Sequence, residues 1–470
     1  MKQVIDAELK KVHFVSLGCP KNLVDAEIMA GTLQRDGYSV VNDPEEAHTV
    51  IVNTCGFIED SKAESISKIL EMGRLKEEGK ISRVVVAGCL AQRYKDELVK
   101  ELPEADIFVG SGQFQQISQI LKSNDKGSKE KTFFHLPTYL QEESTPRVNS
   151  QPSYRAYLKI SEGCLKRCAF CAIPLIRGNL QSRTLSNVIN EAKLLAAGGV
   201  KELNIISHDF TDYGWDLRRK DSQATESPAK LLEELAKIEG LKWIRLLYLY
   251  PDGIDAELLR VIRENKKICR YFDMPLQHIS DSMLQRMNRK MTRKEIEFAL
   301  TNIRKEIPEA VIRTQFIVGF PGETEENFQE LLGFIETQKF DRIGCFKYSP
   351  EEGTPGGKMA DQVADDIKER RWNELMALAQ KISRKKHKAL IGQIQEVVIE
   401  GYSEETELLL KARNSQQAPD IDGIVYINEG LGKIGDFVKV KISESLDYDL
   451  VGSIVDSGEA FSAALPSELN

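Results

Sequence analysis

The chain has 470 residues, 41% of them hydrophobic and 29% charged, which is enough for two or three globular domains. It has no run of about 18 apolar residues and no apolar stretch after the charges of MKQVIDAELKKVHF, so we expect a cytoplasmic protein without signal peptide or membrane span. The net charge of −8 gives no general case for nucleic-acid binding, and eight cysteines indicate metal or redox chemistry rather than disulfides.

Residues 10–125 are expected to form a parallel α/β domain. Apolar segments rich in β-branched residues predict strands at 12–17, 49–54 and 83–88. Helical stretches follow them, such as 22–37, which ends on glycine. This alternation is typical of a parallel sheet covered by helices.

A polar stretch at 126–150 predicts a linker, and a second α/β domain is expected at 151–386. Its predicted strands alternate with helical segments, which favours a partial or full barrel of six βα units. The strands are expected at 157–161, 202–207, 243–251, 271–276, 313–320 and 342–349. Apolar residues at helical spacing in 363–383 predict a packed connecting helix.

Residues 387–457 change to short strands and turns. Five strands are expected there, and so many in so short a segment predict a small β-barrel. Their ranges are 394–402, 407–413, 423–429, 436–443 and 450–455.

Three cysteines, Cys164, Cys168 and Cys171, have the spacing C-x3-C-x2-C. Thiolates at such spacing suit zinc or an iron–sulfur cluster, and structural zinc usually takes four protein ligands. Three ligands leave one position open for something else to bind. The loop follows the first strand of the second domain, so it should lie at the carboxyl end of the sheet, where α/β proteins build their sites.

This motif, with Phe170 before its last cysteine, resembles that of the radical S-adenosylmethionine (SAM) enzymes. The resemblance implies a 4Fe–4S cluster whose open iron binds the amino and carboxylate groups of SAM. One electron then cleaves SAM to methionine and a 5′-deoxyadenosyl radical. The segment FIVGFPGET at 316–324 resembles the family's SAM-adenine strand. The implied SAM contacts are Phe170, Arg183, Ser207 and Gly319.

A second group of cysteines, Cys19, Cys55 and Cys89, lies in the first domain. Each follows a predicted strand, at intervals of 36 and 34 residues. Parallel strands end at one edge of a sheet, so the three thiols should converge and form a second metal site with three ligands. Cys269 and Cys345 lie in apolar strands without partners and are expected to pack in the core.

Two cysteine triads followed by a small β-barrel resemble the radical SAM methylthiotransferase superfamily over nearly the whole chain. The resemblance implies an N-terminal cluster domain, a radical SAM partial (βα)6 barrel and a C-terminal five-stranded TRAM barrel. It also implies two 4Fe–4S clusters, SAM as methyl donor and radical source, and an electron donor such as flavodoxin or ferredoxin. These cofactors carry the chemistry, so no side chain is assigned as catalytic, and His278 is expected to be structural.

Phrases such as SLGCPKNLVDAE at 16–27 and QAPDIDG at 417–423 resemble the ribosomal-protein aspartate methylthiotransferases, the RimO family. SHDFTDYG at 207–214 does so too, with His208 in place of the usual glutamine. This branch adds a methylthio group to the β-carbon of an aspartate in small-subunit ribosomal protein twelve. Two alternatives remain, a transfer-RNA adenosine methylthiotransferase and a non-catalytic iron–sulfur carrier.

The charge of the C-terminal barrel bears on that choice. Residues 391–456 hold thirteen acidic and five basic residues. A barrel that binds RNA should be basic, because neutralising phosphate supplies much of the affinity. The acidic barrel therefore favours docking of a basic ribosomal protein, or of the small ribosomal subunit, over transfer RNA. The alternative is that these acids only form a solvated face.

Overall fold

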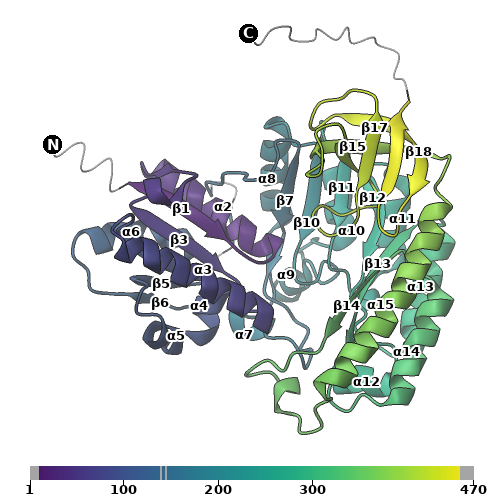
Figure 1. The fold of residues 1–470 in the computed structure, drawn as a ribbon, viewed down its shortest axis with the longest axis horizontal. Helices are drawn as coiled ribbons and strands as arrows, with labels where there is room; N and C mark the ends of the chain where they lie inside the picture. The colour runs from purple at the N-terminus through teal and green to yellow at the C-terminus, as the bar shows by residue number, and fades with distance from the viewer. Residues whose placement is uncertain (1–9, 138–139, 143–144, 456–470) are drawn as a thin grey trace.

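The computed structural model describes residues 10–137, 140–142 and 145–455. Figure 1 shows an N-terminal α/β layer beside a central α/β body, with the C-terminal barrel above the central body. No helix in these described ranges is both long and apolar enough to cross a membrane.

The N-terminal layer is a six-stranded parallel sheet in the order β2-β1-β3-β4-β5-β6. The three strands expected from the sequence are β1, β3 and β4, and every residue of β3 is buried because helices cover both faces of the sheet. The strands are β1 Lys11–Ser16, β2 Ser39–Val40, β3 Thr49–Thr54, β4 Arg83–Gly88, β5 Ile107–Gly110 and β6 Thr132–Phe133. The α-helices are α2 Pro20–Arg35, α3 Glu59–Glu77, α4 Cys89–Tyr94, α5 Asp96–Glu101 and α6 Ile117–Asp125.

The central body is an open sheet of six parallel strands in the order β14-β13-β12-β11-β10-β7, which confirms the partial barrel. The strands are β7 Arg155–Lys159, β10 Glu202–Ile206, β11 Trp243–Leu246, β12 Ile268–Asp273, β13 Val311–Val318 and β14 Arg342–Lys347. Two short strands, β8 Ser161–Glu162 and β9 Gln181–Ser182, pair separately.

Helices between the strands cover the outer face of the central sheet (Figure 1). Capping boxes begin two of them, at Thr292 and at Thr324. The helices are α7 Ile173–Arg177, α8 Leu185–Ala197, α9 Trp215–Lys220, α10 Pro228–Ala236, α11 Ala256–Glu264, α12 Asp281–Arg286, α13 Arg293–Glu306, α14 Glu325–Gln338 and α15 Asp365–Lys388. Helix α15 is the connecting helix expected at 363–383.

The C-terminal strands close into a barrel in the order β15-β16-β17-β19-β18. All five expected strands are present, and β15 pairs with β18 to complete the closure. They are β15 Ile394–Tyr402, β16 Leu410–Asn414, β17 Val425–Glu429, β18 Phe437–Ser445 and β19 Leu450–Ile454.

This barrel covers the amino ends of the central strands. Glu202, the first residue of β10, accepts from Arg413 of β16 at 2.6 Å and from Arg245 of β11 at 3.2 Å. Trp243, the first residue of β11, packs edge-on against Phe437 of β18 with ring centroids 4.8 Å apart. The C-terminal barrel thus closes the amino ends and leaves the carboxyl ends of the strands for a site.

The segment expected to be a linker contributes to the packing between domains. Thr132–Phe133 adds β6 to the N-terminal sheet. Arg147 forms buried ion pairs with Glu27 of α2 and with Glu191 of α8, both at 2.7 Å. The connection is therefore anchored to both bodies that it joins.

Candidate functional site

The first cysteine triad lies at the carboxyl edge of the N-terminal sheet. Cys19 precedes α2, Cys55 follows β3, and Cys89 begins α4 directly after β4. Gly18 has a φ of +88°, and a Cβ on it would lie 2.7 Å from the Cβ of Cys55. Only glycine permits both this backbone conformation and the close approach of the two loops.

The second triad lies in the loop between β8 and α7, which carries Cys164, Cys168 and Cys171. Gly163 begins this loop with a φ of +68°, and a Cβ there would lie 2.1 Å from the carbonyl oxygen of Asn179. The glycine before the motif is thus required for the fold of the loop.

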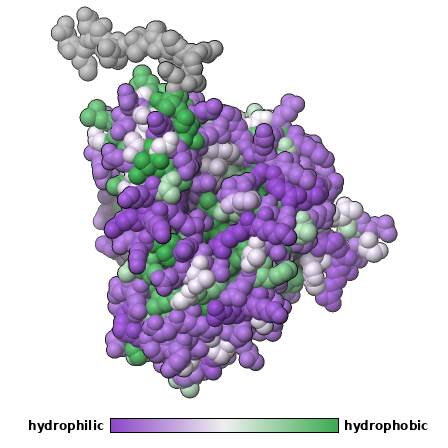
Figure 2. Space-filling model, turned by 90° about the vertical axis from the view of Figure 1, so that its right-hand side faces the viewer, coloured by the Kyte–Doolittle hydropathy of each residue, from purple (hydrophilic) through white to green (hydrophobic). Residues whose placement is uncertain are grey.

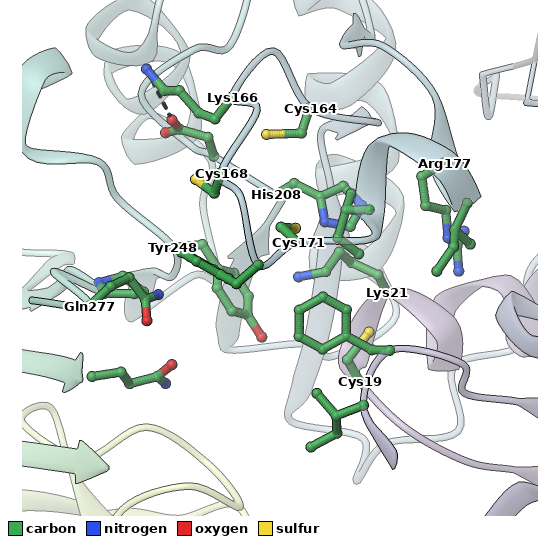
Figure 3. Close-up of a pocket in the computed structure, with 18 of the residues that line it drawn as sticks. Cys19, Lys21, Cys164, Lys166, Cys168, Cys171, Arg177, His208, Tyr248 and Gln277 are labelled. Atoms are coloured by element: carbon green, nitrogen blue, oxygen red, sulfur yellow. Dashed lines mark ion pairs between the residues drawn. The ribbon is translucent and has the colours of Figure 1, made fainter. Parts of the chain in front are cut away.

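Both triads line one cavity of about 560 Å³ at the carboxyl ends of the two sheets (Figure 3). All six cysteines thus border the same space. The wall contains polar residues from both bodies and several apolar ones. Beside the six cysteines it includes Lys21, Phe57, Ile58, Lys166, Phe170, Ile176, Arg177, His208, Asp209, Tyr248, Tyr250, Gln277, Arg289 and Gln315.

Three thiols of this cavity are buried and carry their protons when no metal is bound. Burial raises the pKa of Cys89, Cys164 and Cys171 to about 12, so as free thiols they are protonated at neutral pH. A metal that binds them displaces these protons. Arg177 lies 3.2 Å from the sulfur of Cys89, and Arg289 donates to the sulfur of Cys168 at 3.7 Å. Such cations stabilise the negative charge of thiolates in a cluster.

The six thiols do not form a ready-made site for a single ion. Within the part of the chain that the structure describes, no three His, Cys, Asp or Glu side chains converge closely enough to bind one metal ion. The cysteines of an iron–sulfur cluster bind separate irons and need not converge on one point. Three thiols in each triad, with an arginine at one sulfur of each, are a donor set that fits an iron–sulfur cluster with one open iron.

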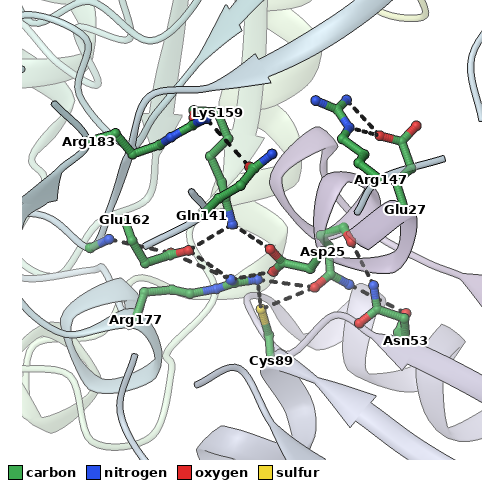
Figure 4. Close-up of polar contacts among 12 residues, drawn as sticks. Asp25, Glu27, Asn53, Cys89, Gln141, Arg147, Lys159, Glu162, Arg177 and Arg183 are labelled. Carbon is green, nitrogen blue, oxygen red and sulfur yellow. Dashed lines mark hydrogen bonds and ion pairs between the residues drawn. The ribbon is translucent and has the colours of Figure 1, made fainter. Parts of the chain in front are cut away.

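A buried ionic network crosses the interface between the N-terminal and central bodies and reaches the first triad at Cys89 (Figure 4). Arg177 of α7 binds Asp25 of α2 at 2.5 Å and lies 3.4 Å from Glu162 of β8. Lys159 of β7 pairs with the same two carboxylates. Two cations and two carboxylates thus balance within a buried interface, and Arg177 also reaches the sulfur of Cys89.

The four expected SAM contacts lie in different surroundings. Phe170 lines the cavity. Arg183 is buried and bound to Glu191 and to the carbonyl oxygen of Lys159 at 2.7 Å. Ser207 directly follows β10 and accepts a hydrogen bond from Lys21 with its carbonyl oxygen. Gly319 follows β13 with its backbone N–H bound by Glu323. Only Phe170 is among the described residues of the cavity wall, and a role for any of the four in binding SAM stays a prediction.

Three wall residues were not singled out from the sequence. Tyr248 and Gln277 follow β11 and β12 and adopt positive φ values of 63° and 72°, which is costly for residues other than glycine and is common at functional sites. Lys21 extends from α2 between the two triads, where burial lowers the pKa of its ammonium group. Lys21 lies within the segment 16–27 that resembles the family, but no spacing rule distinguishes these three residues in the sequence.

Two histidines flank the site without the geometry of catalytic bases. His208 is buried at 3.7 Å from Glu162, and burial lowers its pKa to about 4. His278 is fully buried and accepts from the backbone N–H of Ser280 at 3.0 Å. The expectation that His278 has a structural role agrees with this contact.

Three family models match the chain. Residues 11–110 match the uncharacterized protein family UPF0004, residues 158–335 the radical SAM superfamily, and residues 391–455 the TRAM domain. A solved structure of similar fold is the radical SAM methyltransferase TsrM from Kitasatospora setae, with a TM-score of 0.58 and 14% identity. It covers 79% of this chain and 89% of its own. At that identity the likeness concerns the fold alone.

Curated relatives match almost end to end. The ribosomal protein uS12 methylthiotransferase RimO of Bdellovibrio bacteriovorus is 67% identical over 449 residues, which are 96% of this chain and 98% of the relative. The protein of the same description from Geobacter sulfurreducens is 50% identical over 446 residues, 95% of this chain and 99% of the relative.

The fold, the cysteine motif and the family matches define a radical SAM enzyme that has an added α/β domain and a TRAM barrel. The match extends over the full domain arrangement and not only over the central body. The chain belongs to the RimO family of methylthiotransferases, and it is a sulfur-transferring radical SAM enzyme.

Proposed function

We propose that this enzyme adds a methylthio group to the β-carbon of an aspartate in ribosomal protein uS12, free or within the small ribosomal subunit. We assign residues 10–125 to the auxiliary cluster domain, 126–150 to the connection, 151–386 to the radical SAM core and 387–457 to the TRAM domain. Electrons would come from a donor such as flavodoxin or ferredoxin.

The observation that carries this proposal is the single cavity shared by both cysteine triads. We assign one 4Fe–4S cluster to Cys164, Cys168 and Cys171, and a second to Cys19, Cys55 and Cys89. When bound, these clusters and SAM supply a carbon radical, a sulfur atom and a methyl group. Hydrogen removal and sulfur insertion must take place within contact distance, which a shared cavity permits.

The residues around the triads bind, orient and exclude water. Arg177 and Arg289 would stabilise the charge of the two clusters through the sulfurs of Cys89 and Cys168. Phe57 and Ile58 of the N-terminal body and Phe170 of the cluster loop give the wall an apolar part. A dry wall would protect a radical from side reactions with solvent.

The TRAM barrel is the proposed docking surface for uS12. Acidic residues lie beside exposed apolar ones, and Figure 2 shows apolar side chains between polar ones over this end of the molecule. An apolar patch with a charged rim is typical of a protein-binding site. The exposed apolar residues of the barrel include Ile394, Tyr402, Leu408, Leu431 and Ile434. The acidic surface opposes binding of RNA.

The test is mass spectrometry of uS12 from cells with and without this gene, followed by reconstitution with SAM and a reductant. We expect a methylthio group on one aspartate only when the enzyme is present. Replacing either cysteine triad by alanine should remove about half of the iron and abolish the modification. An unmodified uS12 together with a methylthio group on adenosine in transfer RNA would refute the proposal.

A further inference from the structure

Lys21 lies between the two cysteine triads. It is the second residue of α2, two positions after Cys19, and it lines the cavity with 5% of its surface exposed. Figure 3 shows its amino nitrogen pointing into the space between Cys171, His208 and Tyr248. The side chain thus crosses from the N-terminal body to the mouth of the central sheet.

The ammonium group of Lys21 has few partners there. It donates one hydrogen bond, to the carbonyl oxygen of Ser207 at 3.1 Å, and lies 3.5 Å from the ring centroid of Tyr248. In the described ranges, no carboxylate lies within ion-pair distance of it and no second hydrogen-bond acceptor reaches it. An ammonium group carries three N–H donors, so two remain for a ligand.

The other cations of the cavity wall already have partners. Lys166 pairs with Asp252 at 3.1 Å and has two further carboxylates within 3.6 Å. Arg177 is bound by Asp25 and Glu162. Arg289 stacks on the ring of Tyr250 and donates to a carbonyl oxygen and to the sulfur of Cys168.

Lys21 therefore differs from its neighbours, because the carboxylates that act on its buried charge, those of Glu162 and Asp273, lie beyond ion-pair distance. Removing an ammonium group from water is costly unless a charged partner replaces the lost hydration, and the face of Tyr248 offsets only part of this cost. A bound carboxylate would supply the missing charge and accept the two free N–H groups.

We propose that Lys21 binds the side-chain carboxylate of the substrate aspartate, an inference that rests on the proposed function. Two carboxylates enter this cavity, that of the substrate and that of SAM. The family resemblance places the carboxylate of SAM on the open iron at Cys164, Cys168 and Cys171. That leaves the substrate carboxylate for Lys21, whose backbone adjoins Cys19 and whose ammonium group, at Ser207 and Tyr248, lies between the two triads.

The assignment explains how the reacting carbon would be positioned. The β-carbon of aspartate is bonded directly to the carboxylate carbon, so holding the carboxylate fixes the β-carbon between the two triads. It also gives specificity, because asparagine or alanine at the target position would leave the ammonium group buried and unpaired.

A double-mutant cycle tests the contact. The holoenzyme with both clusters and SAM, but without reductant, is titrated with uS12 and with uS12 whose target aspartate is replaced by asparagine. We expect this replacement to weaken binding at least about tenfold for the enzyme with Lys21, and less than about twofold for Lys21→Gln. Lys21→Arg should retain most of the difference.

The control is Lys166→Gln in the same cavity. Carboxylates of the enzyme already pair with Lys166, so the asparagine replacement in uS12 should still weaken binding about tenfold in this variant. Iron content and visible absorption of each variant establish that the clusters are loaded. If Lys21→Gln does not load, amine labelling of the unchanged enzyme replaces it, and uS12 should protect Lys21 while the asparagine form should not.

Each contrary result has its own meaning. If the asparagine replacement weakened binding equally for the unchanged enzyme and for Lys21→Gln, the inference would be overturned. The proposed function would stand, provided that the unchanged enzyme modifies uS12 on turnover. A tenfold loss of SAM affinity in Lys21→Gln without coupling to the aspartate would assign the lysine to SAM and also overturn it. A uS12 that the unchanged enzyme binds but never modifies would overturn the proposed function and the inference together.

Discussion

Replacing Arg177 by methionine should loosen the interface between the N-terminal and central bodies. The arginine side chain is 1% exposed and balances Asp25 and Glu162 together with Lys159. Burial opposes the ionisation of Glu162, but the charges of Lys159 and Arg177 outweigh it and hold its pKa well below the usual range. Without Arg177, two buried carboxylates share one cation. Breaking a buried pair in this way costs about 3–5 kcal/mol.

Hydrogen exchange of α2 and α7 measures this loss locally, which matters because a chain of several domains need not unfold in one step. A loss of about 3–5 kcal/mol corresponds to exchange faster by about two to four orders of magnitude where opening of the interface controls it. The double variant Arg177→Met with Asp25→Asn restores the charge balance and should recover part of the protection.

The matched control is Arg260→Met on α11. Arg260 also bridges two carboxylates, at 2.8 and 2.9 Å, but its side chain is 43% exposed. Exposed pairs contribute about 1 kcal/mol or less, so exchange in the control should hardly change. If Arg177→Met behaved like Arg260→Met, the network would contribute nothing to the interface and the reasoning from burial and charge balance would be wrong.

Two further predictions concern the first triad and the TRAM contact. Gly18→Ala should displace Cys55 and lower iron content by about half, whereas Gly79→Ala, with φ +74° but no atom within 4 Å of the added Cβ, should retain both clusters. Burial opposes the ionisation of Glu202, but the charge of Arg413 outweighs it and lowers the pKa of Glu202. The ionised carboxylate therefore stabilises the contact between the TRAM barrel and the central body fully above about pH 4.5, and this contribution is lost as the pH falls through the lowered pKa. Hydrogen exchange of β16 against pH measures this loss, and Glu202→Gln should remove that pH dependence.

The sequence predicted the fold where the signal is local. Continuous β-branched runs such as 49–54 predict buried parallel strands because both faces of such a sheet are covered. Short strands escape this pattern. Thr132–Phe133 lies among polar residues and becomes a strand only because β5 offers its free edge. Arg147 likewise lies in a polar segment, and its burial depends on Glu27 and Glu191, which are far away in the sequence.

The site could be predicted as far as spacing determines chemistry. Six cysteines were found because strand ends converge and because thiolates at short spacing bind metals. Lys21 could not be found, because what distinguishes it is that folding brings no carboxylate into ion-pair distance of it among the described residues. Arg183 is the opposite case: it is a cation close to the motif in the sequence and was therefore expected to contact SAM. In the structure it is bound by Glu191 instead of facing the cavity.

The TRAM barrel and the cavity lie at opposite ends of the central strands. The TRAM barrel contacts Glu202 at the amino end of β10, whereas Ser207, just past its carboxyl end, contacts Lys21 at the cavity. Five strand residues separate these ends by about 16 Å. A partner docked on the TRAM barrel therefore needs a projecting loop of at least that length to bring an aspartate to the triads. Docking and catalysis should consequently be separable.

A peptide that carries the target aspartate without the rest of uS12 tests this separation. At saturation it should be modified at a rate close to that of the whole protein, but with a higher KM, because the TRAM contacts are missing. Reversing three exposed acids of the barrel should slow association of whole uS12 and reduce its salt dependence, since surface charges mainly steer encounter. The same reversal should leave the peptide unaffected. These acids are Glu404, Glu405 and Glu407. If the reversal impaired the peptide as much as the whole protein, the acids would act on the cavity itself and the barrel would not be a separate docking surface.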